Sequence, residues 1–327
     1  MKNIAIVCGG DSSEFEVSLK SGANLKSMMD SEKYASYIVF MKDSYWAVRM
    51  EDREDIQIDK SDFSFILDGS KITFDCAYIT IHGTPGENGI LQSYFELIKM
   101  PYTSCNVFVS ALTFNKFACK SFLKEFDIPS ADAIMLRKGD TINADAILLR
   151  LGSPCFVKPN NAGSSFGVSK VKSAKEIIPA LENAFAEDDE VIIEQFLSGT
   201  EITNGVYCVN GKITVLPITE IVSENEFFDY EAKYTGKSHE ITPARLSKEI
   251  ETETKELTER IYKILGCTGI VRIDYIINGK GINLLEVNTT PGMSPASIIP
   301  QQIKAEGLEH KAVFSAIIED AILRMKK

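Results

Sequence analysis

Short apolar runs alternate with helical patterns over the first hundred residues. The apolar runs are of the length and composition typical of buried parallel strands, and they cover residues 3–8, 37–41 and 75–83. Residues 13–29 and 88–98 instead carry the 3.6-residue spacing of amphipathic helices. Alternation of strand and helix predicts a small doubly wound α/β domain over residues 1–100. In such a domain ligands collect at the carboxyl ends of the strands.

The remaining pattern predicts two α+β domains, residues 101–195 and residues 196–327. The first combines a helical stretch at 106–126, a second helix at 174–187 and three strands at 156–159, 167–171 and 191–197. In the second, two strands near 201–218 precede a helix at 248–265, a hairpin at 269–288 and a last helix at 309–325. Between them the polar stretch 223–245 is predicted to be a mobile loop near the functional site.

Composition narrows the classes of function. The 327 residues carry a formal net charge of −11 and no run of lysine and arginine, which disfavours a nucleic-acid partner. No apolar stretch approaches membrane-spanning length, and the apolar run after Met1 is too short for a signal peptide. The seven cysteines form no CxxC pair, so they indicate free thiols in a reducing compartment. We therefore expect a cytoplasmic protein without a membrane partner.

The segment FVKPNNAGSSFGV, residues 156–168, has the composition of a phosphate-binding loop but an unusual order. A Walker-type loop places its lysine after the glycines, at the start of a helix. Here Lys158 comes first, at the end of a predicted strand, and the small residues follow in a turn that leads to another strand. The expected site therefore takes its lysine from a sheet.

The hairpin at 269–288 predicts a metal site. Arg272 and Asp274 lie two residues apart, as do Glu286 and Asn288, so each pair shares one face of its strand. A three-residue turn at 279–281 would place Asp274 opposite Glu286 and Arg272 opposite Asn288 on that face. Carboxylate and amide oxygens suit magnesium shared with substrate phosphates. The alternative is a ladder of salt bridges on a solvated sheet, but the strongly apolar strands around the carboxylates favour a nearby cation.

Taken in order, these features resemble the ATP-grasp fold, in which two α+β domains clamp ATP behind an N-terminal α/β domain. Further motifs narrow the resemblance to the D-alanine–D-alanine ligases: GGDSSEFEVSLKSG, HGTPGENGILQS, GSSFG, DYEAKY and EVNTTPGMSPAS. The resemblance spans nearly the whole chain. It implies an enzyme that uses ATP to join two D-alanines for peptidoglycan precursor synthesis, with two magnesium or manganese ions, in a cytoplasmic homodimer.

The resemblance also implies which residues bind the nucleotide. Lys116 and Lys158 would neutralise the α- and β-phosphates, and the loop 162–167 would cover the β- and γ-phosphates with its backbone N–H groups. The remaining implied ATP-binding residues are Ser165, Glu194, Leu197, Glu201 and Lys233. Asp274, Glu286 and Asn288 would hold the metal.

For the substrates, the resemblance implies that Glu16 binds the ammonium group of the first D-alanine and that His82 borders the same crevice. Arg272 would stabilise the oxyanion of the tetrahedral intermediate. Gly292 and Ser297 would receive the carboxylate of the second D-alanine. Ser164 and Tyr234 would link the lid and the polar loop to Glu16 and exclude water from the acyl phosphate.

Three alternatives stay open at this point. The chain could join D-alanine to D-lactate or D-serine, it could be another ATP-grasp ligase, or it could be an ATP-binding module without activity. A nicotinamide-binding protein is disfavoured because GGDSSEFE lacks the GxGxxG fingerprint. With Tyr234 in place we expect D-alanine to be preferred over D-lactate, because a neutral phenol does not repel the ammonium group as an imidazolium would.

Overall fold

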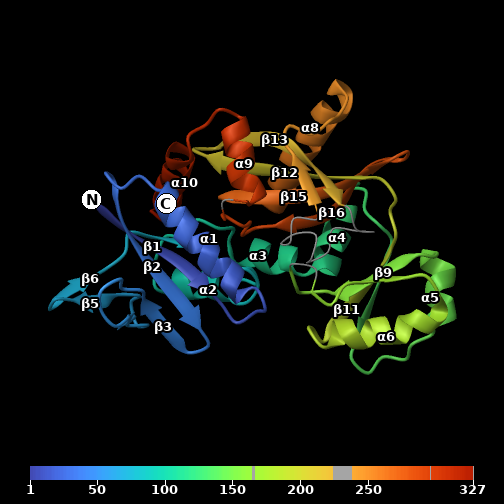
Figure 1. Ribbon diagram of the computed structural model, residues 1–327, viewed down its shortest axis with the longest axis horizontal. Coiled ribbons are helices and arrows are strands. Elements are labelled where there is room, and N and C mark those ends of the chain that lie inside the picture. The colour runs from blue at the N-terminus through green and yellow to red at the C-terminus, as the bar shows by residue number, and fades with distance from the viewer. Residues whose placement is uncertain (164–165, 224–237, 295, 327) are drawn as a thin grey trace.

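Three large sheets, each with its own hydrophobic core, and the small hairpin of β5 and β6 make up the described part of the computed structural model of the protein (Figure 1). It describes residues 1–163, 166–223, 238–294 and 296–326. In Figure 1 the N-terminal sheet lies at the left, the second sheet at the lower right and the third above them. Among the described residues no helix is long and apolar enough to cross a membrane. All seven cysteines are free thiols.

The N-terminal sheet has the order β4-β3-β2-β1-β7. Its strands β2, β1 and β7 are parallel, as predicted, whereas β3 and β4 extend the edge as antiparallel strands that the sequence pattern did not predict. The C-terminal helix α10 packs against this sheet, so Phe314 and Ile318 share a core with Ile4 and Ile6. The elements are β1 (Lys2–Gly9), α1 (Phe15–Met28), β2 (Tyr34–Lys42), β3 (Tyr45–Val48), β4 (Ile56–Gln57), the hairpin of β5 (Phe65–Leu67) and β6 (Ser70–Ile72), β7 (Cys76–Ile79), α2 (Ile90–Leu97) and α10 (His310–Met325).

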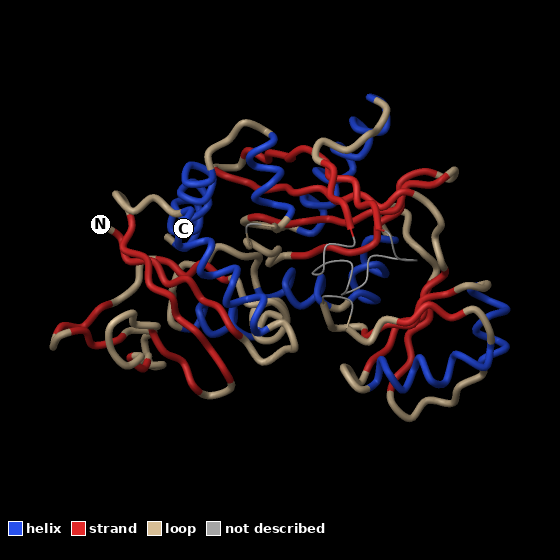
Figure 2. Tube along the Cα trace, viewed as in Figure 1, coloured by secondary structure: helices blue, strands red, loops and turns tan. Residues whose placement is uncertain are grey.

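The second sheet is antiparallel, with the order β10-β9-β11-β8. Helices α5 and α6 pack their apolar residues, such as Leu151 and Leu181, against it, and the tube in Figure 2 shows both on its outer side. The elements are β8 (Ala133–Arg137), α5 (Ala144–Leu151), β9 (Cys155–Pro159), β10 (Ser169–Val171), α6 (Ala174–Phe185) and β11 (Glu190–Gln195). The loop that carries the glycines and serines thus joins two neighbouring strands, β9 and β10, as expected.

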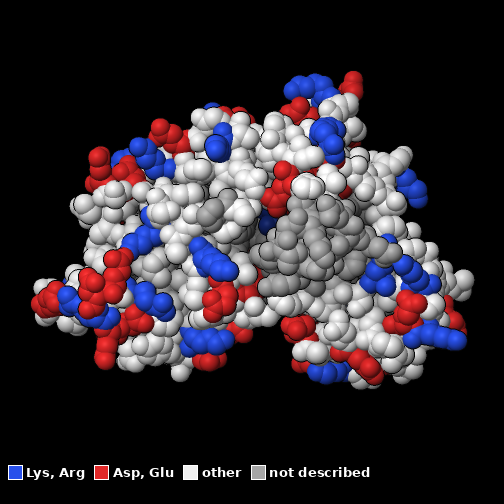
Figure 3. Space-filling view, viewed as in Figure 1, with Lys and Arg blue, Asp and Glu red and all other residues white. Residues whose placement is uncertain are grey.

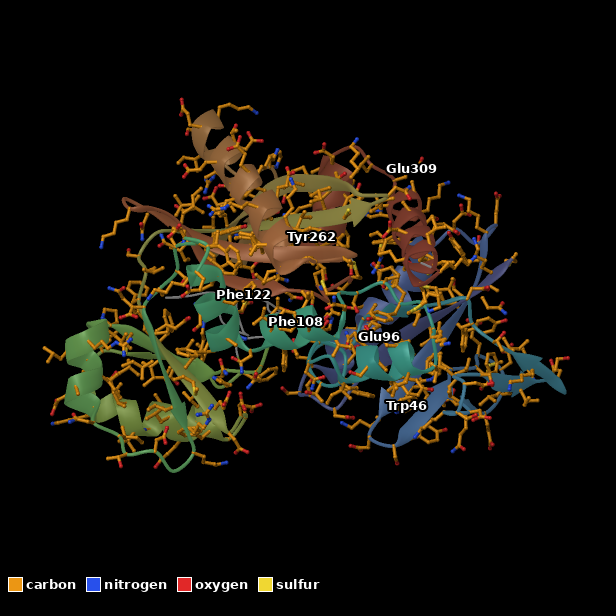
Figure 4. All side chains as sticks on the ribbon, turned by 180° about the vertical axis from the view of Figure 1, so that it is seen from behind. Trp46, Glu96, Phe108, Phe122, Tyr262 and Glu309 are labelled. Carbon is orange, nitrogen blue, oxygen red and sulfur yellow. The ribbon has the colours of Figure 1, made fainter. Side chains whose placement is uncertain are left out.

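The third sheet is also antiparallel, with the order β14-β13-β12-β15-β16. Helices α3, α4 and α8 supply apolar side chains to one core with it, among them Val109, Leu123 and Tyr262. Figure 4 shows Phe108 of α3, Phe122 of α4 and Tyr262 of α8 from behind. The elements are α3 (Val107–Phe114), α4 (Lys116–Lys124), β12 (Thr200–Val209), β13 (Lys212–Ser223), β14 (Ser238–Ile241), α8 (Lys248–Leu265), β15 (Ile270–Asn278), β16 (Gly281–Asn288) and α9 (Ile298–Ala305).

Two helices replace the single helical stretch predicted at 106–126. Asn115 adopts an extended conformation between α3 and α4, and its side chain accepts a hydrogen bond from the N–H of Ala118, which caps α4. This break starts α4 at Lys116, whose N–H donates to the carbonyl of Asn160 in the glycine-serine loop. Although these helices fall within the predicted central domain, they pack on the third sheet. The division into three domains stays a prediction.

The hairpin of β15 and β16 has the predicted pairing but not the predicted turn. Asp274 lies opposite Glu286 and Arg272 opposite Asn288, as expected. The turn, however, contains two residues, Gly279 and Lys280, because Asn278 pairs with Gly281. A β-bulge at Leu285 then shifts the register by one residue before Glu286. The predicted three-residue turn is therefore wrong. The bulge, and not a longer turn, brings Glu286 opposite Asp274.

Candidate active site

A cavity of about 450 Å³ is lined by residues from the second and third sheets, from the start of α1 and from the loops beside them. Most of the binding and catalytic residues expected from the sequence lie together on the wall of this cavity: His82, Lys116, Lys158, Glu194, Leu197, Glu201, Arg272, Asp274, Glu286, Asn288, Gly292 and Ser297. Ser164, Ser165, Lys233 and Tyr234, together with 224–237 of the predicted mobile loop, lie outside the described residues. Glu16 is described, and it does not line the cavity.

The third sheet presents a group of polar side chains to the cavity, with Arg272 and Asp274 at its centre. Arg272 donates two hydrogen bonds to Asp274, from Nε to Oδ1 (2.9 Å) and from Nη2 to Oδ2 (2.8 Å). The Thr203 hydroxyl also donates to Asp274, and Glu286 Oε1 lies 3.8 Å from Arg272 Nη2. Burial alone would lower the pKa of Arg272, but Asp274 and then Glu286 outweigh it and raise that pKa. The guanidinium is thus held by one edge, which leaves further N–H groups to meet a ligand.

Across from this sheet, two buried lysines share one carboxylate. Glu194 on β11 binds Lys158 of β9 through Oε2 (2.5 Å) and Lys120 of α4 through Oε1. Burial alone would raise the pKa of Glu194, yet the two ammonium groups lower it to about 2. Lys116, one turn before Lys120, donates to the carbonyl of Ala162 (2.5 Å) and lies 3.8 Å from Glu286 Oε2. Lys116 and Lys158 thus border the space that the glycine-serine loop approaches, and Lys120 supports Glu194 from behind the cavity wall.

The glutamate that faces the cavity from the N-terminal domain is Glu14, not Glu16. Glu14 is buried and lines the cavity, whereas Glu16 is exposed. The two residues begin α1, where a separation of two positions turns side chains toward opposite sides of a helix. A Cβ atom built on Gly163 would lie 2.4 Å from Glu14 Oε2, so the glycine-serine loop reaches this carboxylate directly. The structure therefore puts Glu14 on the cavity wall, where the sequence had led us to expect Glu16.

His82 and Glu87 line the cavity near Glu14. His82 Nε2 and Ser21 Oγ form a hydrogen bond of 3.2 Å, and burial lowers the pKa of His82 although Glu14 counteracts the effect. Glu87 accepts a hydrogen bond from the N–H of Gly83 (2.7 Å). Burial, and then the negative charge of Glu14, raise the pKa of Glu87 to about 7. The raised pKa of Glu87 favours its protonated form, so Glu87 adds little negative charge next to Glu14.

The loop after β16 and the first turn of α9 form a further end of the cavity, and this loop adjoins His82, since the N–H of Met293 donates to Ser21 Oγ (3.3 Å). Ser297 is the N-cap of α9, and its hydroxyl oxygen accepts a hydrogen bond from the N–H of Ser294 (2.9 Å). A Cβ atom on Gly292 would lie 2.8 Å from Ser297 Oγ, so only glycine leaves this approach open. Backbone N–H groups at the start of a helix favour an anion. This end suits a carboxylate.

Two of the residues that the sequence analysis missed had a signal in the helical spacing. Glu14 continues the buried stripe of α1 at Ser18, Ser21 and Leu25, a spacing of four, three and four residues that leaves Glu16 out. Lys120 follows Lys116 by four residues and therefore shares its helix face. Glu87 and Glu240, which also line the cavity, had no such signal because neither lies on a helix.

We expect the buried carboxylate of Glu194 to make the fold sensitive to acid. Its pKa lies below the ordinary value of 4.5, so its charge stabilises the fold above pH 4.5, and this contribution is lost as pH falls toward 2. The difference in unfolding free energy between the unmodified protein and Glu194→Gln should shrink by up to about 1.4 kcal/mol per pH unit in that range. Urea unfolding at several pH values measures it. Glu253→Gln, at an exposed position of α8, is the control and should show no such trend. A Glu194→Gln difference that stays constant with pH would contradict the assignment.

A cleft between two α+β units that carries a strand lysine, a helix lysine, a glycine-serine loop and opposed carboxylates defines an ATP-grasp enzyme. The family model described as D-ala D-ala ligase N-terminus matches residues 3–105, and that described as D-ala D-ala ligase C-terminus matches residues 122–319. A D-alanine–D-alanine ligase from Phocaeicola vulgatus is 57% identical over 320 residues, which cover 98% of this chain and 99% of that one. The chain belongs to the D-alanine–D-alanine ligase family.

Solved structures agree with this assignment. D-alanyl-alanine synthetase A from Vibrio cholerae superposes with a TM-score of 0.87 at 29% identity, over 98% of both chains. A D-alanine–D-alanine ligase from Bacillus anthracis, solved as a complex with ATP, has a TM-score of 0.79 at 29% identity and covers 100% of this chain and 99% of that one. The predicted family, ATP-grasp fold and enzyme class are confirmed.

Proposed function

We propose that the chain joins two D-alanines to D-alanyl-D-alanine and converts ATP to ADP and phosphate through an acyl phosphate. One observation carries the proposal: a single cavity holds a cationic region at Lys116 and Lys158, a clamped arginine, and an ammonium-binding and a carboxylate-binding group, Glu14 and Ser297. Nucleotide, first substrate and second substrate therefore have chemically suitable places beside one another. The product would serve peptidoglycan precursor synthesis in the cytoplasm, where ATP is supplied.

The cationic region suits the phosphates of ATP. Lys116 and Lys158 would neutralise the α- and β-phosphates, and Glu194 would hold Lys158 in place between strands. Glycines around the loop of residues 162–167 allow close approach of backbone N–H groups to the terminal phosphate. Leu197 and Glu201, which line the same part of the cavity, would meet the adenine and the ribose. The nucleotide-binding roles of Ser165 and Lys233 stay predictions.

The donor set on the third sheet fits magnesium. Glu286 and Asn288 present a carboxylate and an amide oxygen beside Asp274 on one face, which are the oxygen ligands that magnesium prefers. Glu286 Oε2 lies 3.8 Å from Lys116 Nζ, and its Oε1 lies 3.8 Å from Arg272 Nη2, so two cations flank this carboxylate at the cavity. When bound, two magnesium ions would neutralise charge on the β- and γ-phosphates.

The reaction requires mainly positioning and charge neutralisation. Glu14 would bind the ammonium group of the first D-alanine and so direct its carboxylate toward the γ-phosphate. The amine of the second D-alanine would then attack the acyl phosphate, while the Gly292–Ser297 loop holds its carboxylate. Arg272 would stabilise the oxyanion of the tetrahedral intermediate, since its guanidinium is fixed by Asp274 and faces the cavity. Exclusion of water by Ser164 and Tyr234 stays a prediction.

The position of Glu14 gives a testable result. We expect Glu14→Gln to raise the KM for the first D-alanine at least about tenfold, because an amide cannot replace a buried carboxylate as the partner of an ammonium group. Glu16→Gln, two residues away and exposed, is the matched control and should change this KM less than about twofold. The measurement is initial rate against D-alanine concentration. A larger effect of Glu16→Gln would restore the original assignment.

The function is tested by phosphate release from ATP and magnesium with D-alanine, D-serine and D-lactate as second substrates. Our proposal predicts turnover with D-alanine alone and little ester product from equimolar D-alanine and D-lactate at neutral pH. Mostly ester product would instead favour a D-alanine–D-lactate ligase. No turnover with any substrate would favour an ATP-binding module. The homodimer stays a prediction, which sedimentation would test.

A further inference from the structure

The cavity wall includes an acidic side chain, that of Glu240, which lies far along the sequence from Glu14 and has no role in the steps above. Glu240 lies on the edge strand β14, where it pairs with Ile221 of β13, and both residues line the cavity. The neighbouring carboxylate on β13, Glu220, is bound by Arg245 through two hydrogen bonds (2.9 and 2.6 Å) and does not line the cavity. Of these two carboxylates on adjacent strands, only Glu240 is thus available to a ligand in the cavity.

Glu240 is fixed next to the first turn of α9. Gln301 donates a hydrogen bond from Nε2 to Glu240 Oε2 (2.6 Å) and another to the carbonyl of Ala296 (3.0 Å). Ala296 precedes Ser297, the N-cap of α9, so the carboxylate is tied to the end of the cavity that suits a substrate carboxylate. Burial raises the pKa of Glu240, whereas Gln301 and the positive charge of Arg272 lower it. The positive charge of Arg272 therefore influences the pKa of the Glu240 carboxylate.

These two neighbouring features match the two charges of an amino acid. The start of α9 favours the α-carboxylate, and Glu240 favours an α-ammonium group. A hydroxy acid such as D-lactate has the carboxylate but no cation, so it would leave the half-buried carboxylate of Glu240 without a counter-charge. That asymmetry discriminates between two substrates of nearly equal size.

We propose that Glu240, held by Gln301, is a specificity-determining residue that selects an α-ammonium group in the second substrate and disfavours hydroxy acids. This inference rests on the proposed function, and it assigns to the second substrate what Glu14 provides for the first.

The test is Glu240→Gln, which keeps the shape of the side chain and removes its charge. Two quantities are measured: the KM values for the first and second D-alanine, and the ratio of ester to dipeptide formed from equimolar D-alanine and D-lactate. We expect the second KM and the product ratio each to rise about tenfold, while kcat at saturation and the first KM change less than about twofold. A residue with a merely structural role would not shift the product ratio.

Glu220→Gln is the matched control, since it removes a carboxylate from the adjacent strand outside the cavity, and it should leave the product ratio unchanged. Gln301→Leu, which removes only the anchor, should shift the ratio in the same direction by a smaller factor. This second variant keeps the inference testable if Glu240→Gln does not fold. An unchanged second KM and product ratio in Glu240→Gln, or a rise in the first KM alone, would overturn the assignment. Absence of any ligation by the unmodified enzyme would overturn the proposed function itself.

Discussion

Arg272→Ala is expected to lower kcat for ligation by about 10²–10³ while ATP still binds. The reason is that a donor to the oxyanion acts mainly in the transition state, and removal of one such donor typically costs about that factor. In the structure Arg272 is only 18% exposed and is oriented by two hydrogen bonds to Asp274, so its position is fixed before the substrates arrive. Phosphate release measures kcat, and calorimetric titration measures ATP binding.

The control for this variant has to separate catalysis from stability. Loss of the guanidinium leaves Asp274 with the Thr203 hydroxyl as its remaining hydrogen-bond donor among the contacts described above, so the melting temperature of each variant is measured as well. Arg245→Ala is the matched variant, because Arg245 also pairs with a glutamate on the third sheet but lies away from the cavity. It should keep kcat within about twofold. Turnover unchanged in a folded Arg272→Ala enzyme would show that Arg272 only supports the hairpin.

Asp274→Asn and Glu286→Gln are expected to raise the magnesium concentration required for half-maximal activity by about 10–100-fold. Each change replaces a negatively charged oxygen with a neutral ligand on the face where the metal would bind. The two variants should differ in one respect. Asp274 also orients Arg272, so Asp274→Asn should lower kcat even at saturating magnesium, whereas Glu286→Gln should recover most of it. Activity as a function of magnesium concentration measures both effects.

Glu220→Gln is the control for both variants, because it removes a carboxylate of the third sheet that faces away from the cavity. Its magnesium dependence should match that of the unmodified enzyme. If both Asp274→Asn and Glu286→Gln also kept that dependence, the two carboxylates would serve only as the salt-bridge ladder for Arg272. The alternative left open by the sequence would then be correct.

The sequence alone predicted the parts of the site that depend on short-range periodicity. The two-residue repeat of strands correctly placed Asp274 on the same face as Arg272, and Glu286 on the same face as Asn288, and the helix over residues 248–265 matches α8. The surface also agrees with the charge pattern, because acidic and basic side chains are interspersed over the face seen in Figure 3. Local spacing carries this information because it fixes which side chains share a face.

Features that depend on tertiary packing were missed. A bulge at Leu285 has no local sequence signature, so the hairpin register was right for the wrong reason. Edge strands such as β4 and β14 are too short to show a period, and β14 is the strand that brings Glu240 to the cavity. The choice of Glu16 over Glu14 came from motif position, whereas burial of α1 against the sheet decides which glutamate faces inward.

The central claim is most directly tested by oxygen transfer. D-alanine labelled with ¹⁸O in its carboxylate is incubated with the enzyme, ATP and magnesium, and the phosphate and dipeptide are analysed by mass spectrometry. Attack of the carboxylate on the γ-phosphate, followed by attack of the amine on the acyl phosphate, leaves one labelled oxygen in the phosphate. Our account therefore predicts D-alanyl-D-alanine and singly labelled phosphate in equal amounts. Unlabelled phosphate, or phosphate without dipeptide, would contradict it.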